Sequence, residues 1–312
     1  MKILILCAQP GSLSTGGMIN SLSTIYAYHF TKWLSKFPDC QISYASAYIK
    51  PDDAKLLDEY DFCFSLVNRG IKIMNPLTYT ELRKKIKHQI ITICASSKIV
   101  DKEDILLFIM GKRKHNTMRV YWGADFDLLK PEKPTTINIL IDHKYYGNKS
   151  SSLFKKDRTN IILKSLLQYK NSGHDIIIKH IGFGKINGVD DNYVPDDFKQ
   201  SKSMDFREIY PYYNEAHIYV VTHPESFGLT TIECASASAL IVQPHGYIKK
   251  DIINKLHHVS IFDMQHINWD DIISQINIPK SMQCAKLFSY EKTVNQLYYH
   301  MKKFIPNEQS NP

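Results

Sequence analysis

The sequence predicts an α/β protein built from two Rossmann-like domains. Apolar runs of strand length alternate with longer amphipathic segments along the chain, a pattern that is typical of parallel sheets covered by helices. The chain also has 312 residues, which is enough for two domains that each bury a core of their own. We expect the first domain over residues 1–130 and the second over 131–285, followed by an amphipathic helix over 286–304 and a polar tail over 305–312.

The composition is that of an ordinary globular protein. Hydrophobic residues make up 44% of the chain and charged residues 22%, values that are common among soluble domains. The six cysteines are scattered without the paired spacing of metal ligands, and we expect them to be reduced core residues. No apolar run approaches the length of a membrane span, and the apolar start at residues 3–7 is too short for a signal peptide. These observations predict a cytoplasmic protein.

The formal net charge of +8 admits three kinds of anionic partner: a nucleotide, a membrane surface or a nucleic acid. The densest basic stretches, residues 83–85 and 112–115, carry no interleaved aromatic side chains, and lysine greatly outnumbers arginine. Arginine is the residue better suited to bind phosphates through pairs of hydrogen bonds. We therefore expect no nucleic-acid partner, whereas peripheral contact with a membrane stays an open alternative.

The first half of the chain begins as Rossmann-like halves commonly do. Residues 2–8 read as a buried strand, residues 9–17 as a polar loop that contains Gly16 and Gly17, and residues 18–36 as a long helix. Further strands are expected over residues 41–47, 62–67 and 89–94. The fingerprint G-x-G-x-x-G is absent, so the chain lacks the usual dinucleotide signature.

The second half repeats this alternation. It begins with a strand over residues 137–142, then has a helix that ends near residue 169, a strand over 175–181, a polar loop over 188–203 and a helix over 205–216. Residues 217–242 read as strand, loop, helix and strand, which is one βαβ unit. The loop of this unit follows the carboxyl end of its strand, where open α/β sheets bind ligands.

The βαβ unit carries the residues that predict a ligand. The helix that begins at Gly228–Leu229 presents free backbone N–H groups and a positive dipole end, which suit a phosphate, and Gly228 allows close approach to the backbone. Glu225 lies in the loop and Glu233 on the helix, eight residues later, so both point to about the same side. Carboxylates beside a phosphate site can accept hydrogen bonds from sugar hydroxyls. The arrangement indicates a sugar nucleotide; a structural βα unit with two solvated glutamates is the alternative.

The string from Pro224 to Ala235, PESFGLTTIECA, resembles the E-x7-E signature of retaining glycosyltransferases of the GT-B fold, the family-four group. The resemblance implies that Glu225 contacts the transferred sugar and that Glu233 binds the ribose of the nucleotide. It also implies a cradle for the donor diphosphate, made of Ser226, Phe227, Gly228 and Leu229. In this fold the two domains face each other across a cleft, and a helix like that over 286–304 returns to the first domain.

Two further features fit the same resemblance. The paired glycines Gly16 and Gly17 are similar to the glycine loop that faces the donor in these enzymes. Family members also place a basic residue at the start of the first helix of the second domain, where it holds the donor phosphates. This implies a catalytic role for Lys156, with Lys155 and Arg158 as neighbouring candidates. A lysine that is simply solvated at a helix start is an equally good interpretation of Lys156.

The sequence Asp125-Phe126-Asp127 is similar to the D-x-D metal motif of the other glycosyltransferase fold, GT-A. Two such carboxylates could hold a divalent cation that neutralises a diphosphate. The motif is common, however, and a complete second α/β half follows it in this chain. We therefore expect no metal and no cofactor.

The sequence predicts a glycosyltransferase that moves a sugar from a nucleotide-sugar donor to a hydroxyl of an acceptor (a glycan, a lipid or a small molecule), with retention at the anomeric carbon. Glu225 would position the sugar, while backbone amides and Lys156 stabilise the departing diphosphate. Two alternatives stay open. One is another enzyme of the same fold, a sugar-nucleotide epimerase or a phosphorylase, and the other is a non-catalytic basic binding protein.

Overall fold

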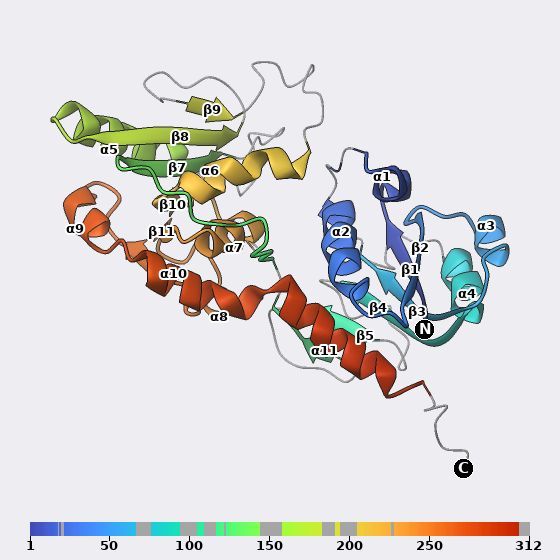
Figure 1. The fold of residues 1–312 in the computed structure, drawn as a ribbon. Helices are drawn as coiled ribbons and strands as arrows, with labels where there is room; N and C mark the ends of the chain where they lie inside the picture. The colour runs from blue at the N-terminus through green and yellow to red at the C-terminus, as the bar shows by residue number, and fades with distance from the viewer. Residues whose placement is uncertain are drawn as a thin grey trace, which may run out of the picture. The chain divides into compact units, whose positions relative to one another are not determined.

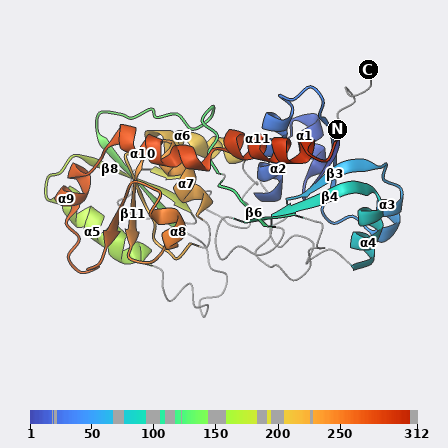
Figure 2. The same ribbon diagram turned by 90° about the horizontal axis from the view of Figure 1, so that it is seen from below.

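The structure is a computed structural model that describes residues 1–17, 19, 22–66, 76–93, 105–108, 117–121, 123–143, 158–182, 191–193, 205–225 and 228–305. The chain forms two compact units, each with one parallel sheet (Figures 1 and 2). The predicted fold class, two Rossmann-like domains, is confirmed. The first unit comprises Met1–Trp122, Met204–Phe206 and Tyr290–Pro312, and the second comprises Gly123–Ser203 and Arg207–Ser289. The second unit therefore begins at Gly123 rather than at the predicted residue 131.

The sheet of the first unit has the strand order β2-β1-β3-β4-β5-β6, and its described pairs are all parallel. Residues 3–7 of β1 are fully buried, which explains why this strand is an unbroken apolar run: a parallel strand is covered on both faces. The strands are β1 (Lys2–Cys7), β2 (Gln41–Ser46), β3 (Tyr60–Ser65), β4 (Ile86–Ile93), β5 (Ile105–Phe108) and β6 (Thr117–Arg119).

The loop predicted over residues 9–17 contains a short helix, α1, so that prediction is wrong for its central part. Pro10 stands at the first position of α1, where its missing N–H is not needed, and Gly16 closes the helix in the left-handed conformation with φ 70°. The helices of the first unit are α1 (Pro10–Thr15), α2 (Leu22–Leu34), α3 (Pro51–Lys55), α4 (Pro76–Lys84) and α11 (Tyr290–Lys302).

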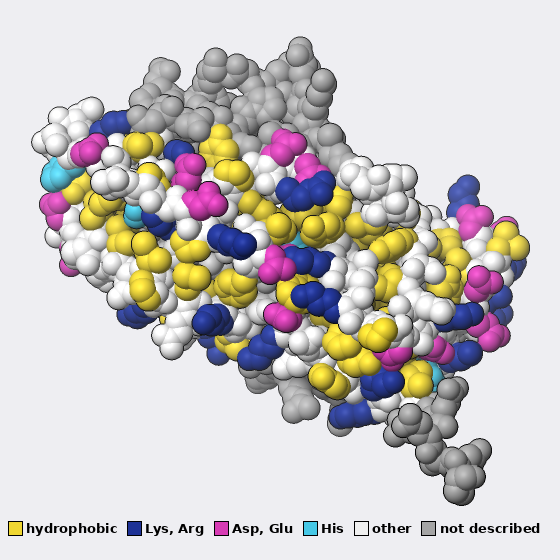
Figure 3. Space-filling view, viewed as in Figure 1, with side chains coloured by type: hydrophobic (Ala, Val, Ile, Leu, Met, Phe, Trp, Pro, Cys, Tyr) yellow, Lys and Arg dark blue, Asp and Glu magenta, His cyan; other side chains and the backbone are white. Residues whose placement is uncertain are grey.

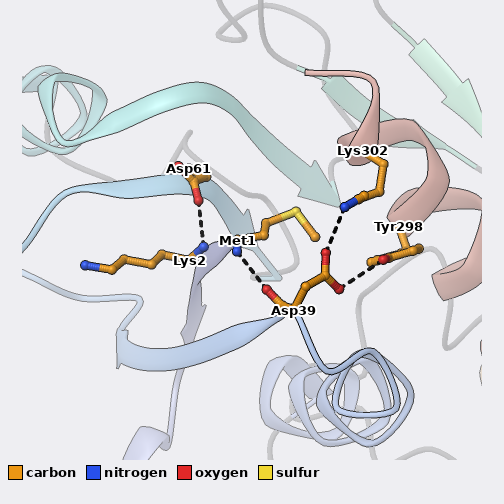
Figure 4. A network of polar contacts seen from close by, with 6 residues as sticks. All are labelled: Met1, Lys2, Asp39, Asp61, Tyr298 and Lys302. Carbon is orange, nitrogen blue, oxygen red and sulfur yellow. Dashed lines mark hydrogen bonds and ion pairs between the residues drawn. The ribbon is translucent and has the colours of Figure 1, made fainter. Parts of the chain in front are cut away.

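The last helix, α11, packs within the first unit. The ring of Tyr298 stacks on Phe37 with 3.6 Å between ring centroids, and its hydroxyl donates to Asp39 Oδ1 at 2.9 Å. Lys302 Nζ lies 3.1 Å from Asp39 Oδ2, and the amino group of Met1 donates to the Asp39 carbonyl at 2.7 Å (Figure 4). The turn before β2 therefore joins α11 to the start of β1.

The sheet of the second unit has the order β12-β11-β10-β7-β8-β9 and is parallel throughout its described pairs. β9 lies within the segment predicted as a polar loop over 188–203. That prediction is wrong there because β9 pairs with β8 without having an apolar run of its own. The strands are β7 (Ile137–His143), β8 (Ile176–Gly182), β9 (Asp191–Tyr193), β10 (Ile218–Val220), β11 (Leu240–Pro244) and β12 (His258–Ile261).

The order of strands reverses between β7 and β10. From β7 the chain adds β8 and β9 on one side, and it then returns to add β10, β11 and β12 on the other. Open α/β sheets bind their ligands beyond the carboxyl ends of the strands at such a reversal. The helices of this unit are α5 (Thr159–Asn171), α6 (Tyr210–Glu215), α7 (Leu229–Ser236), α8 (Lys250–Ile253), α9 (Trp269–Ser274) and α10 (Ile278–Ala285), with short 3-10 helices η3 (Phe206–Ile209) and η4 (Lys286–Phe288).

The segment 123–134, which precedes β7, is bonded to the second unit along its length. Ala124 N–H donates to the Phe288 carbonyl at 3.0 Å. Further along, the ammonium group of Lys133 donates to three backbone carbonyls, those of Asn214 (2.9 Å), Ala216 and Ala237 (2.7 Å). The last two are the C-caps of α6 and α7. One lysine side chain therefore closes the carboxyl ends of two helices, and burial lowers its pKa to about 8.

Hydropathy, surface charge and thiols can be compared among the described residues. In the described part of the chain, no helix is long and apolar enough to cross a membrane. On the face shown in Figure 3, basic side chains are interspersed with acidic ones, so the net positive charge is not gathered there into one patch. The five cysteines that the structure describes are free thiols, and Cys7, Cys63 and Cys234 are buried.

Candidate functional site

Three elements meet at the carboxyl ends of the central strands of the second unit. The loop 221–225 follows β10, and β10 lies between β11 and β7 in the sheet (Figure 1). The backbone N–H of Arg158, the N-cap of α5, donates to the Thr222 carbonyl at 2.8 Å, and the N–H of Glu225 donates to the Tyr247 carbonyl at 2.9 Å. These bonds fix the loop after β10 between the start of α5 and the loop after β11.

The amino end of α7 has a glycine as its N-cap. This N-cap is Gly228, which has φ 72°. The first N–H groups of a helix have no intrahelical partner, and glycine has no side chain that could cap them. A Cβ atom at this position would lie 3.2 Å from Thr231 Oγ1 and 3.3 Å from Thr231 Cβ. The Thr231 hydroxyl is itself buried and has no hydrogen-bond partner among the residues that the structure describes. The positive dipole end and free amides of α7 are the features with which helices bind phosphates.

Glu233 lies in α7 and is almost fully buried, with 7% of its surface exposed. Burial raises the pKa of its carboxyl to about 8. Within the described residues, no hydrogen-bonding or charged neighbour offsets this burial. A carboxyl group in such a place is stabilised when a bound molecule supplies hydroxyl donors. The role of Glu233 in binding a ligand stays a prediction.

Glu225 is also shielded from water, with 9% of its side chain exposed. Its Oε1 lies 2.7 Å from Nε2 of His223, whose side chain is 1% exposed. On the other side of the imidazole ring, Nδ1 of His223 lies 3.4 Å from Thr222 Oγ1. The sequence analysis missed His223. The available signal was its spacing, since residues two apart in an extended segment point to the same side.

The comparisons with known proteins bear on the fold. No family model matches the chain, and no curated protein matches its sequence. The sucrose-phosphate synthase of Thermosynechococcus elongatus is similar in structure, with a TM-score of 0.59 at 11% identity over 97% of this chain and 99% of that one. AviGT4, a glycosyltransferase of avilamycin A biosynthesis, has a TM-score of 0.58 at 7% identity over 97% of both chains.

The chain has the GT-B fold. A UDP-N-acetylglucosamine 2-epimerase shares it as well, with a TM-score of 0.50 at 8% identity over 99% of this chain and 98% of that one. At these identities the likeness establishes the architecture alone, and the chemistry has to be argued from the site.

Within this GT-B fold, the predicted donor-binding residues fall into two sets. Glu225, Gly228, Leu229 and Glu233 lie together in the second unit, between β10 and the first two turns of α7. Gly16 and Gly17 belong to the first unit, where Gly17 N–H donates to the Ser12 carbonyl at 2.9 Å. The predicted residues Lys155, Lys156, Ser226 and Phe227 lie outside the described residues.

The D-x-D sequence has a structural role in the GT-B fold of this chain. Asp125 is buried, and its Oδ1 accepts the backbone N–H of Asp127 at 3.1 Å, which stabilises the turn that these residues form. Among the described residues there is no group of three or more histidine, cysteine or acidic side chains that could hold a metal ion. Independence from metal stays a prediction.

Proposed function

We propose that this protein is a glycosyltransferase that moves a sugar from a nucleotide-sugar donor to a hydroxyl of an acceptor. The observation that carries the proposal is the buried carboxyl of Glu233, which has no polar partner in the described residues and lies behind the glycine-capped start of α7. A nucleotide sugar has the complementary groups, since it carries a diphosphate next to a ribose with two hydroxyls. Both carboxylates and the helix end lie at the reversal of strand order, where this type of sheet binds ligands.

We assign one part of the donor to each group. The free amides at the start of α7 would bind the diphosphate, Glu233 the ribose hydroxyls and Glu225 the transferred sugar. Preorganised amides that face the departing diphosphate would stabilise the charge that develops on it as the glycosidic bond breaks. Lys156 would add a positive charge to the same phosphates. Retention at the anomeric carbon and membership of the family-four group are the finer parts of this proposal, and they rest on the E-x7-E resemblance.

A second function deserves a direct test, because an epimerase shares the fold over nearly the whole chain. The two reactions differ in what becomes of the donor. A glycosyltransferase cleaves the bond between sugar and diphosphate and releases the nucleoside diphosphate. An epimerase inverts one carbon of the sugar and can return an isomeric nucleotide sugar.

The experiment is a thermal-shift screen with UDP, GDP, ADP and dTDP and with UDP-glucose, UDP-galactose, UDP-N-acetylglucosamine, GDP-mannose and ADP-glucose. A ligand present at a hundred times its dissociation constant stabilises the folded state by about 2.7 kcal/mol, which raises the melting temperature measurably. Chromatography of the nucleotides after incubation with the stabilising sugar nucleotide then separates release of diphosphate from isomerisation. Absence of a shift with every compound would contradict the proposal.

A further inference from the structure

We infer that His223 is a positioning residue that orients the carboxylate of Glu225 so that it can bind the transferred sugar. The inference rests on the proposed function and adds a group to it. The ring nitrogen Nε2 lies 2.7 Å from Glu225 Oε1, which is the distance of a strong hydrogen bond to a carboxylate. Both side chains are buried at the exit of β10, so water competes little for this bond.

The surroundings of the imidazole indicate how its proton is held. Thr222 Oγ1 lies 3.4 Å from Nδ1, and a threonine hydroxyl can donate a proton to an unprotonated ring nitrogen. With Nδ1 accepting, the ring proton is on Nε2 and is donated to Glu225. The side chains of Thr222, His223 and Glu225 would then form a short chain of hydrogen bonds that ends on the carboxylate of Glu225.

This chain gives Glu225 a defined direction. A glutamate side chain has three rotatable bonds, and its rotamer freedom must be lost before it can hold a sugar hydroxyl. The backbone of Glu225 is fixed by its N–H bond to the Tyr247 carbonyl, and the ring of His223 fixes the carboxylate end. A carboxylate has about four lone-pair sites, so a bond from His223 is compatible with a further bond from a hydroxyl.

The test uses two substitutions that place an amide at different points. In His223→Gln the side-chain N–H₂ can reach about the place of Nε2, so the bond to Glu225 can be remade. In His223→Asn the side chain is shorter by one carbon, and its amide can occupy only the place of Nδ1. The first readout is kcat for hydrolysis, in which water takes the sugar and the nucleoside diphosphate is released, with the nucleotide sugar that stabilises the wild type among UDP-glucose, UDP-galactose, UDP-N-acetylglucosamine, GDP-mannose and ADP-glucose. The second is the calorimetric affinity for the matching nucleoside diphosphate.

We expect His223→Asn to lower kcat by roughly ten- to a hundredfold, the range for loss of one hydrogen bond to a charged group, while affinity for the diphosphate stays unchanged. His223→Gln should restore most of kcat. In a Glu225→Gln background, His223→Asn should cause little further loss, because the two residues act through one interaction.

The outcomes separate this inference from the proposed function. If Glu225→Gln lowers kcat but His223→Asn does not, or if their losses multiply, His223 does not act through Glu225 and the inference is overturned. If kcat of His223→Gln is no higher than kcat of His223→Asn, a proton donated from the place of Nε2 does not support the reaction, and the inference is overturned. If Glu225→Gln leaves kcat unchanged while the diphosphate still binds, the assignment of Glu225 in the proposed function fails instead. Unchanged affinity for the diphosphate also shows that each variant is folded.

Discussion

At the scale of single residues, Glu233 is the group whose surroundings fit its charge least well. Its carboxyl is buried in α7, and its pKa is raised from 4.5 to about 8. Soluble proteins rarely bury a carboxylate unless a hydrogen-bonding or charged partner offsets the free energy of lost hydration. The described residues supply no such partner, so we regard Glu233 as a group whose partner arrives with the ligand.

This burial predicts how stability depends on pH. Because the pKa is higher in the folded state, the folded chain binds more protons than the unfolded chain between about pH 4.5 and pH 8, so this residue makes stability fall as pH rises through that window. Glu233→Gln removes the effect. We expect the variant to gain stability over the wild type as pH rises from 5 to 8, by an amount on the order of several kcal/mol.

Urea denaturation at pH 5 and pH 8 measures this gain. Glu291→Gln is the control, since it makes the same substitution at an exposed position on α11. A difference between Glu233→Gln and wild type that does not grow with pH would show that the carboxyl is not destabilised in the folded state.

At the scale of elements, the start of α7 depends on the absence of a side chain at Gly228. Alanine would be strained there because φ is 72°, and its Cβ would crowd Thr231 at 3.2 Å. We expect Gly228→Ala to destabilise the fold by more than the roughly 1–2 kcal/mol of a left-handed alanine. It should also weaken binding of the nucleoside diphosphate, because the amides at the helix start would shift.

Gly173→Ala is a matched control for this variant. Gly173 also has a positive φ, 102°, but no atom lies within 4 Å of the place where its Cβ would be. It should lose stability through backbone strain alone and bind the diphosphate normally. Melting temperatures with and without the diphosphate test both statements, and equal effects of the two substitutions on binding would argue against a phosphate site at α7.

The far end of α7 depends on Lys133. Its ammonium group donates to the carbonyls of Asn214, Ala216 and Ala237, and of these the Asn214 carbonyl also accepts the Glu132 N–H, so Lys133→Met would remove the lysine donor from all three. We expect a loss of about 3 kcal/mol or more in the free energy of unfolding. Lys130→Met, on the exposed surface of the same segment, should change it little. Urea denaturation measures the free energy of unfolding of both variants. Similar losses in the two would show that the three hydrogen bonds of Lys133 do not stabilise the fold.

The sequence predicted the elements that have strong local signals. Buried parallel strands such as β1, β7 and β11 each contain a short run of apolar residues, so their positions were predicted closely. β9 was missed because Asp191–Tyr193 is polar and becomes a strand only by pairing with β8. In the site, Glu225, Gly228 and Glu233 were predicted from the string Pro224–Ala235 and its family resemblance, and their roles stay predictions. Lys133 was missed because its role depends on which carbonyls the fold brings to it, whereas His223 was missed although its spacing of two residues from Glu225 was a local signal.

At the scale of the whole molecule, the expected independence from metal is testable. The second unit offers a helix end for the diphosphate, and Asp125 is occupied within its own turn. We therefore expect release of nucleoside diphosphate from the preferred nucleotide sugar to survive EDTA. Measurement with EDTA, and then with added Mg²⁺ or Mn²⁺, decides the point. Complete loss that a cation restores would show that a metal is needed.

The bonds of segment 123–134 have a practical consequence for taking the molecule apart. A fragment that starts at residue 131, the boundary that sequence alone suggests, would lack Ala124 and Asp125. It would lose the bond from Ala124 N–H to the Phe288 carbonyl and the bond by which Asp125 stabilises its turn. A fragment that spans residues 123–289 keeps them, together with the lysine that closes α6 and α7. Chimaeras that exchange the second unit between relatives should therefore be joined at Gly123 and Ser289, and residues 204–206 should be taken from the same relative as the first unit, because they pack with that unit and bond to Ile19.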